Sequence, residues 1–255
     1  MFIPKIQVEP LKPFFNKRLI CRYLSPEKAA NKTLPFAEKT YAMYPELRGA
    51  LEGKTEEERK AIIEQAVEAR LTDAAEEIQR RVEYFQAKFD AFLPDFIAAQ
   101  CALYRYTWKA EHPIINCWVG YIPFYPRSAA AHWFYVSYQD EERVFAGAVH
   151  EINHMIFFEK WKEMCGGGDM PEPGHPSPLW YLQEMIVDPT LNDPAVKPYT
   201  LYENRAYPQF YAVEIGGKSI MDHLQAMYNA KTGIEDFLHR GLAFVEDNYA
   251  AIHGA

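Results

Sequence analysis

The sequence predicts an α+β fold that is mostly helical, with a small sheet beside one buried helix and two lobes around a cleft. Three observations predict it. Apolar residues recur at spacings of three and four between residues 55 and 94, which is the period of a helix. Short β-branched and aromatic runs between residues 104 and 138 have the composition of strands. A third region, which begins after Asp140 and ends before Gly166, is apolar nearly all round and predicts a buried helix.

The 255 residues contain no internal repeat and no linker, so we expect one domain over residues 1–255. Its N-terminal lobe, residues 1–163, contains the long helices, the sheet and the buried helix. Its C-terminal lobe, residues 164–255, is helical. The net charge of −8 argues against a nucleic-acid partner, because no basic arm or basic helix face offsets it.

Targeting and membrane signals are missing from the sequence pattern. No run approaches the ~18 apolar residues that a membrane span needs, and the N-terminal residues lack the apolar core of a signal peptide. The four cysteines form no C-x-x-C pair, which is typical of free thiols in a reducing compartment. We therefore expect a cytoplasmic protein with no membrane partner. The pattern leaves its oligomeric state undetermined.

The first hundred residues are predicted to be largely helical. Residues 1–54 contain short helical stretches between prolines, and the pattern leaves their type undetermined. Thr55 and Glu58 match a capping box that begins a long helical region. We expect its apolar stripe to face the core, with a dimer seam as the alternative. Pro94 is expected to end this region, and the pattern allows a break near Thr72. The stripe consists of Ile63, Val67, Leu71, Ala74, Ile78, Val82, Phe85, Phe89 and Phe92.

Strands are expected after a further short helix over residues 95–104. The three candidates are Tyr104–Trp108, Ile114–Tyr121 and His132–Tyr138, each a β-branched or aromatic run. The last one leads into the buried helix through a very short connection.

The C-terminal third is predicted to begin with a loop over residues 165–178, rich in Gly and Pro, which we interpret as either a lid or a plain connector. Beyond residue 190, two helix N-termini are marked by Ser219 with Asp222 and by Thr232 with Glu235.

The buried helix carries the motif His150-Glu-Ile-Asn-His154. Residues four apart lie on one helix face, so His150 and His154 can offer two imidazole nitrogens to one metal ion. Glu151 lies next to them and can take a proton from a water there. This pattern is typical of a zinc hydrolase. The alternative is that core hydrogen bonds satisfy these side chains.

The helical state of this motif has independent support. Asp140 matches an N-cap, and the two following glutamates favour the positive end of the helix dipole. Two histidines and a glutamate in so apolar a helix need polar partners, because burying them unpaired is unfavourable. A third metal ligand is one such partner.

Glu184 is the leading candidate for a third ligand. It lies in a second predicted helix, where Ser177 can N-cap, Pro178 fits the first helical position and Pro189 ends the helix. Asp188, four residues on, faces the same way and can accept the free ring N–H of a ligand histidine. A mere polar stripe is the alternative, and His175 in the preceding loop is the runner-up ligand.

Together, His150-Glu151-x-x-His154 and Glu184-x-x-x-Asp188 resemble the gluzincin branch of zinc metallopeptidases, the thermolysin-like group, over roughly residues 130–190. Another zinc-peptidase group requires Gly and His where this chain has Phe157 and Lys160. The chain has Gln183-Glu184 where the gluzincin family often has Asn-Glu, which weakens any closer assignment.

The resemblance implies a zincin-like fold with Zn²⁺ held by His150, His154 and Glu184, and Glu151 as the general base. Family members use a Tyr or His from the C-terminal part to stabilise the oxyanion, for which Tyr211 and His223 are candidates. They also hold extended substrate along a sheet edge, for which residues 114–121 or 132–138 are candidates, with an internal strand as the alternative.

The leading hypothesis is therefore a zinc-dependent metallopeptidase that acts on a peptide or protein substrate. Two alternatives stay open: a catalytically inactive zincin-fold binding module, and a zinc hydrolase of a non-peptide amide. The pattern does not distinguish endopeptidase from exopeptidase action.

Overall fold

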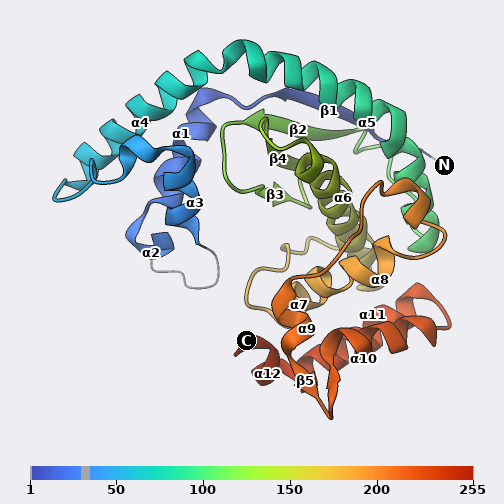
Figure 1. Cartoon of the computed structure of the whole chain (residues 1–255). Coiled ribbons are helices and arrows are strands. Elements are labelled where there is room, and N and C mark those ends of the chain that lie inside the picture. Colours follow the sequence, from blue (N-terminus) through green and yellow to red (C-terminus); the bar gives the residue numbers. More distant parts are fainter. Residues whose placement is uncertain (1, 30–34, 255) are drawn as a thin grey trace.

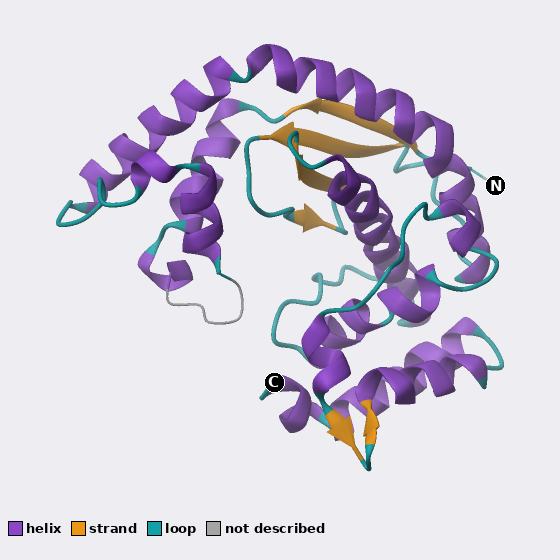
Figure 2. Cartoon of the chain, viewed as in Figure 1, coloured by secondary structure: helices purple, strands orange, loops and turns teal. Residues whose placement is uncertain are grey.

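The computed structural model describes residues 2–29 and 35–254. It is a mixed α+β structure in which helices predominate (Figure 2), as expected. The helices are α1 (Pro13–Tyr23), α2 (Pro26–Ala29), α3 (Phe36–Met43), α4 (Glu56–Asp73), α5 (Ala75–Leu103), α6 (Glu141–Met164), α7 (Pro178–Met185), α8 (Val187–Leu191), α9 (Pro208–Ala212), α10 (Ile220–Asn229), α11 (Ile234–Asp247) and α12 (Tyr249–His253). Two 3₁₀ turns are η1 (Pro45–Leu47) and η2 (Lys197–Tyr199). The strands are β1 (Lys5–Pro10), β2 (Ile114–Gly120), β3 (Arg127–Ser128), β4 (Trp133–Ser137), β5 (Glu214–Ile215) and β6 (Lys218–Ser219).

The main sheet has the order β1-β2-β4-β3. β1, β2 and β4 are parallel, with Val8 opposite Cys117 and Cys117 opposite Phe134. The short β3 runs antiparallel to β4 and forms the edge of the sheet. β5 and β6 form a separate two-stranded hairpin. The strands predicted over residues 114–121 and 132–138 are thus confirmed, and β1 is an addition that the pattern did not reveal.

The strand predicted over Tyr104–Trp108 is wrong. The chain turns there instead, with Arg105 in the left-handed region at φ 50°. Tyr104, Tyr106 and Trp108 are buried, which produces the alternation that resembles a strand. No strand of the described residues pairs with this segment, so the three side chains anchor an irregular connection.

One long curved pair of helices, α4 and α5, arches over the sheet (Figure 1). The capping box at Thr55 and the break between the two helices at Ala74 are confirmed. The predicted end at Pro94 is wrong, because α5 continues through that proline to Leu103. Leu93, Phe96 and Ile97 beside it are fully buried. Their packing outweighs the roughly 3 kcal/mol that an internal proline costs a helix.

The buried helix α6 begins at Asp140, which caps it by accepting a hydrogen bond from the backbone N–H of Arg143. Every residue of α6 from Glu151 to Trp161 is buried. Its apolar side chains join those of α5, β2 and β4 in the largest core of the molecule. The same core extends to Phe237 and Leu238 of α11, so it spans both expected lobes.

A second, smaller core joins α1, α3 and α4. Asn16 of α1 ties this group to the chain that leaves β2. Its amide accepts from the backbone N–H of Tyr121 at 2.9 Å and donates to the backbone carbonyl of Tyr121 at 3.1 Å. Tyr44, which follows α3, donates to the same carbonyl at 2.8 Å. These contacts hold the N-terminal helices next to the segment that leads into β3.

The second predicted site helix is divided in the structure. Ser177 caps α7 and Pro178 begins it, as predicted. The helix ends at Met185 rather than at Pro189, which lies inside the separate helix α8. A proline fits there because backbone N–H groups in the first turn of a helix have no intrahelical partner. The N-terminus marked by Ser219 is confirmed, whereas Gly233 rather than Thr232 caps α11.

No helix among the described residues is long and apolar enough to cross a membrane.

His132 links stability to pH. Its ring is buried against Trp108 and His112. Burial, helped by His112 and opposed by Glu159, lowers its pKa from 6.5 to about 4. Because the unfolded chain binds this proton more readily, the stability that the neutral ring supports is complete above pH 6.5 and is lost as the pH falls toward 4. We expect the free energy of unfolding to fall by about 2 kcal/mol from this group between pH 7 and pH 5.

Urea unfolding of the wild type and of His132→Asn at both pH values measures this difference. Asparagine suits the test because it tolerates the left-handed backbone at this position, where φ is 52°. The variant should lose about 2 kcal/mol less than the wild type over this pH interval. Equal losses in the two proteins would contradict the prediction.

Candidate metal centre

Helix α6 brings His150 and His154 to one point. Because they are four residues apart, their rings lie on the same face, and their Nε2 atoms are 2.8 Å apart. His154 is almost fully buried, with 1% of its side chain exposed, whereas His150 is 26% exposed. Of the two candidate ligands, His154 is thus buried in the core and His150 borders solvent.

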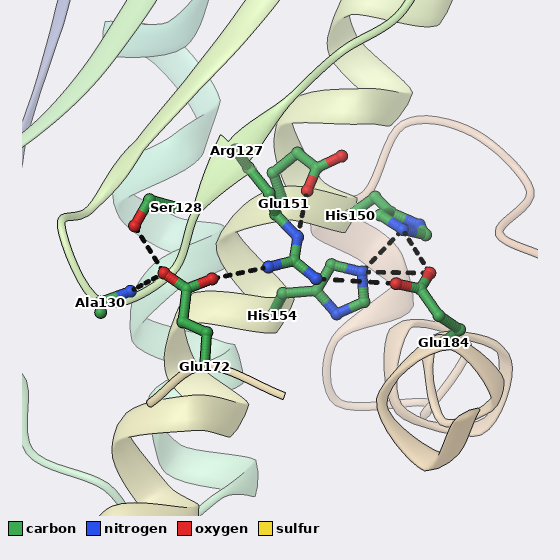
Figure 3. A network of polar contacts seen from close by, with 8 residues as sticks. All are labelled: Arg127, Ser128, Ala130, His150, Glu151, His154, Glu172 and Glu184. Atoms are coloured by element: carbon green, nitrogen blue, oxygen red, sulfur yellow. Dashed lines mark hydrogen bonds and ion pairs between the residues drawn. The ribbon is translucent and has the colours of Figure 1, made fainter. Parts of the chain in front are cut away.

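Glu184 of α7 completes the group from the opposite side (Figure 3). Its Oε2 atom lies 3.5 Å from Nε2 of His150 and 3.5 Å from Nε2 of His154. That oxygen is buried and accepts no hydrogen bond from the described residues. The structure therefore places Glu184 of α7 beside the two histidines of the motif helix, as the sequence predicts.

The three atoms have the spacing that a metal ion requires. Ligand atoms about 2.0–2.1 Å from a tetrahedral ion are about 3.3 Å apart, close to the 2.8, 3.5 and 3.5 Å found between these atoms. An unsatisfied buried carboxylate oxygen facing two imidazole nitrogens is stabilised when a cation lies between them. Among the described residues, this is the cluster of three or more His, Cys, Asp or Glu side chains that could hold a metal.

The electrostatics of His154 and Glu184 favour metal binding. Burial, with Arg127 nearby, lowers the pKa of His154 to about 3, so its ring is neutral and its nitrogen free to bind a metal. Burial opposes ionisation of Glu184, but the two histidines hold its pKa well below the ordinary value. Burial also opposes protonation of His150, yet Glu184 and Glu151 raise its pKa.

Glu151 projects beside the histidines and is paired with Arg127 of β3. The Nε atom of Arg127 lies 2.8 Å from Oε2 of Glu151. Burial raises the pKa of the Glu151 carboxyl, while His150 and Arg127 act against that rise. The cation therefore helps to keep this buried carboxylate ionised.

Arg127 contacts two further carboxylates. Its Nη2 lies 3.6 Å from Glu184, and its Nη1 lies 3.4 Å from Glu172 in the 165–178 loop (Figure 3). Glu172 is held in turn by Ser128 and by the backbone N–H of Ala130, at 2.8 Å. Sequence reasoning missed Arg127, because it lies far from the motif in a short, patternless segment. Only the turn from β3 to β4 brings it to the site.

Asn153, inside the motif, holds α6 from behind. Its Oδ1 accepts hydrogen bonds from Gln100 at 2.5 Å, Tyr104 at 3.2 Å and Thr190 at 3.3 Å. Gln100 lies in α5, Tyr104 directly follows α5, and Thr190 lies in α8. The motif helix is therefore fixed in rotation between its neighbours, with His150 and His154 facing α7.

An open pocket of about 560 Å³ lies next to His150 and Glu151. Its walls come from α1 to α3, the segment before β3, α6 and residues 203–207. Tyr207 lines it and is 37% exposed. Glu184 is the main cause of a raised pKa at Tyr207, followed by burial and Glu151. This hydroxyl therefore lies within the electrostatic reach of the candidate metal centre.

The structure gives Asp188 other partners than the predicted ligand histidine. One carboxylate oxygen accepts from Asn192 at 2.8 Å, and the other accepts from the hydroxyl of Tyr211. No hydrogen bond or ion pair joins Asp188 to His150 or His154 in the part of the chain that the structure describes. The division of α7 from α8 at Ile186 separates the two acids that one continuous helix was expected to align.

The remaining candidates lie away from the pocket walls. Tyr211 is engaged by Asp188 and by the backbone N–H of Ala206 at 3.0 Å. His223 contacts the carbonyl of Ile215 at 2.8 Å and packs against Phe244 with the rings tilted. His175 packs against Trp180 and Tyr181, outside the His150, His154 and Glu184 group. Tyr207 is the better-placed hydroxyl, and the abundance of tyrosines gave no signal for it.

No protein-family model, curated protein or solved structure matches this chain. The case for a function therefore rests on the chemistry of this site. His150, His154 and Glu184 form a largely buried group that could hold a metal ion.

Glu184→Gln removes the charged ligand with little change in shape. We expect it to weaken zinc binding by at least about a hundredfold, because two histidines alone bind zinc loosely. Competition with a chelating dye measures the affinity. Glu246→Gln, an exposed acid of α11, is the matched control and should bind zinc as the wild type does. Unchanged binding by Glu184→Gln would contradict the assignment of this ligand.

Arg127→Gln removes a cation 3.6 Å from the candidate ligand Glu184. Because that cation repels a metal ion, we expect zinc to bind about tenfold more tightly in the variant. The metal-free protein should become less stable, since buried carboxylates lose their partner. Chelator competition and urea unfolding with EDTA test both effects, with the exposed Arg240→Gln as control. Weaker zinc binding would show instead that Arg127 organises the ligands.

Proposed function

We propose that the protein is a zinc-dependent metallopeptidase of the gluzincin type with a zincin-like fold. The observation that carries the proposal is the carboxylate of Glu151 beside the group of His150, His154 and Glu184. Two imidazoles and one carboxylate are a ligand set of catalytic zinc, which leaves a fourth position open. The antiparallel edge strand β3, whose Arg127 contacts Glu151 of α6, supports the zincin-like assignment.

His150, His154 and Glu184 would hold the ion. When bound there, zinc lowers the pKa of a water molecule and polarises a carbonyl group. Glu151 takes the proton of the attacking water on its carboxylate and passes it to the leaving amine. Arg127 keeps Glu151 ionised before that transfer. The hydroxyl of Tyr207 is a donor for the developing oxyanion, in place of Tyr211 and His223.

The substrate backbone is proposed to lie along β3. This strand, and not β2 or β4, is the sheet edge near the motif, because β2 and β4 both have neighbours on each side. The two strands that the sequence offered for substrate binding, residues 114–121 and 132–138, are therefore internal strands of the sheet. An extended peptide beside β3 would pass the pocket next to His150 and Glu151. The free thiols of the four cysteines accord with a cytoplasmic location.

One observation favours a second candidate, a zincin-fold binding module without hydrolysis. Arg127 engages the carboxylate of Glu151 at 2.8 Å, and a general base must be free to accept a proton. In the leading proposal, this ion pair opens when substrate binds, so that Glu151 can accept the proton. In the second candidate the pair persists and no bond is cleaved.

Glu151→Gln separates the two candidates. If the protein is a peptidase, the variant should keep its zinc, because Glu151 is not among the ligands, and hydrolysis should fall by at least about a hundredfold. Cleavage of a peptide library, followed by mass spectrometry, measures the activity. Glu142→Gln, an exposed position in the first turn of α6, should keep full activity. Equal cleavage by Glu151→Gln and the wild type would refute the mechanism.

Reproducible cuts that a chelator abolishes would exclude the inactive binding module. If only non-peptide amides are hydrolysed, and Glu151→Gln abolishes that reaction, the zinc hydrolase of a non-peptide amide is supported instead.

A further inference from the structure

The pocket beside the candidate metal centre is basic, although the chain as a whole is acidic. Five basic side chains line it: Arg22, Lys28, Lys39, Arg143 and Arg205. Only two carboxylates, Glu151 and Glu203, do so, and Glu151 is paired with Arg127. The lining is therefore net positive in a protein whose net charge is −8. The average charge of the chain is negative, so the positive charge of this pocket is opposite in sign to that of the protein as a whole.

These cations have no acidic partner among the residues that the structure describes. No salt bridge joins any of the five to an Asp or Glu side chain within residues 2–29 and 35–254. By contrast, many other basic residues of the chain are paired, such as Arg48 with Glu38 and Arg70 with Glu46. Lys39 and Arg143 line the same pocket, and burial together with the charge of Arg143 lowers the pKa of Lys39.

Aromatic rings of the same pocket hold three of the cations in place. Lys28 lies 5.1 Å from the ring centre of Phe36, and Lys39 lies 5.2 Å from that of Phe124. Phe36 and Phe124 contact each other, with ring centres 4.6 Å apart. On the α6 side, the guanidinium of Arg143 lies 4.4 Å from the ring centre of Tyr125. Such cation–π contacts orient the charges without neutralising them.

The position of the charges suits a chain that passes the metal centre. Lys28 and Lys39 belong to α2 and α3, Arg143 to α6, and Arg205 to the segment that ends at Tyr207. The cations therefore stand on opposite walls, with His150 and Glu151 lining the same pocket. Carboxylates on either side of a bound peptide bond would meet them, and the aromatic surfaces would contact the peptide between those charges.

We propose that this pocket selects acidic peptides, with Asp or Glu side chains flanking the bond next to the metal centre. The proposal rests on the proposed peptidase function for the position of that bond, and on the unpaired cations for the charge. Unpaired positive charges in a cleft raise the local concentration of an anionic substrate and disfavour a cationic one. A peptide fits better than a nucleic acid, because the rest of the acidic surface repels a long polyanion.

Binding of two matched probes tests the charge preference without requiring cleavage. The first is a short fluorescein-labelled peptide of alternating Glu and Ala, and the second has Gln in place of each Glu. Measured by fluorescence anisotropy on the full chain, the acidic peptide should bind at least about tenfold more tightly at low salt. The difference should shrink in about 0.5 M NaCl, where charges are screened. Equal binding of the two probes would overturn the proposal.

A pair of variants locates the preference. Lys28→Gln with Lys39→Gln should abolish most of the difference between the probes. Lys88→Gln with Lys231→Gln removes the same charge from cations that also lie over aromatic rings, Tyr84 and Tyr228, outside the pocket. This control should keep the preference. If both double variants lose it equally, the preference comes from overall charge and the pocket assignment is wrong.

The outcome for cleavage is separable from the outcome for binding. Acidic binding without hydrolysis of any peptide would support the basic pocket and refute the peptidase. Hydrolysis of acidic and amide peptides with equal kcat/KM would support the peptidase and overturn the substrate class. An oligonucleotide of equal charge that binds more tightly than the acidic peptide would overturn the choice of a peptide.

Discussion

The site depends on one constraint: polar and ionisable side chains lie in a helix that is buried nearly all round. His154 is fully buried in α6 and Glu151 nearly so, so each needs a polar partner inside the protein. Glu184 from α7 and Arg127 from β3 are those partners. The same constraint explains Asn153, which satisfies its carbonyl with three donors and thereby sets the rotation of the helix.

Charge balance then links the candidate metal centre to its surroundings. Arg127 pairs with Glu151, Glu184 and Glu172, so one cation serves three buried or half-buried carboxylates. A metal ion between the histidines and Glu184 would supply further positive charge to the same group. The loop that contains Glu172 is tied to β3 through this network, which makes the interpretation of residues 165–178 as a plain connector incomplete. The loop helps to hold the cation that faces the candidate general base.

One wall of the pocket is made by α1, α2 and α3, which contribute no residue to the candidate metal group. Asn16 and Tyr44 fix the N-terminal helices to the backbone at Tyr121, and this attachment places Lys28 and Lys39 opposite α6. These hydrogen bonds are buried and use both the N–H and the carbonyl of Tyr121. They therefore link the N-terminal helices firmly to the sheet. The pocket beside the candidate metal centre thus depends on contacts that lie outside the motif and its helix.

The sequence by itself determined the local features of this protein: the motif helix with its Asp140 cap, the capping box at Thr55, two of the strands, and the three ligand candidates at residues 150, 154 and 184. Helical spacing and capping act within a few residues, so they can be recognised without a partner. Only the tertiary structure decided that α5 continues through Pro94, that Asp188 turns to Tyr211, that Arg127 lies beside the motif, and that Tyr207 and five basic side chains line the adjoining pocket. Each of these features depends on packing between segments far apart in the chain, and the pattern of neighbouring residues does not indicate which segments pack together.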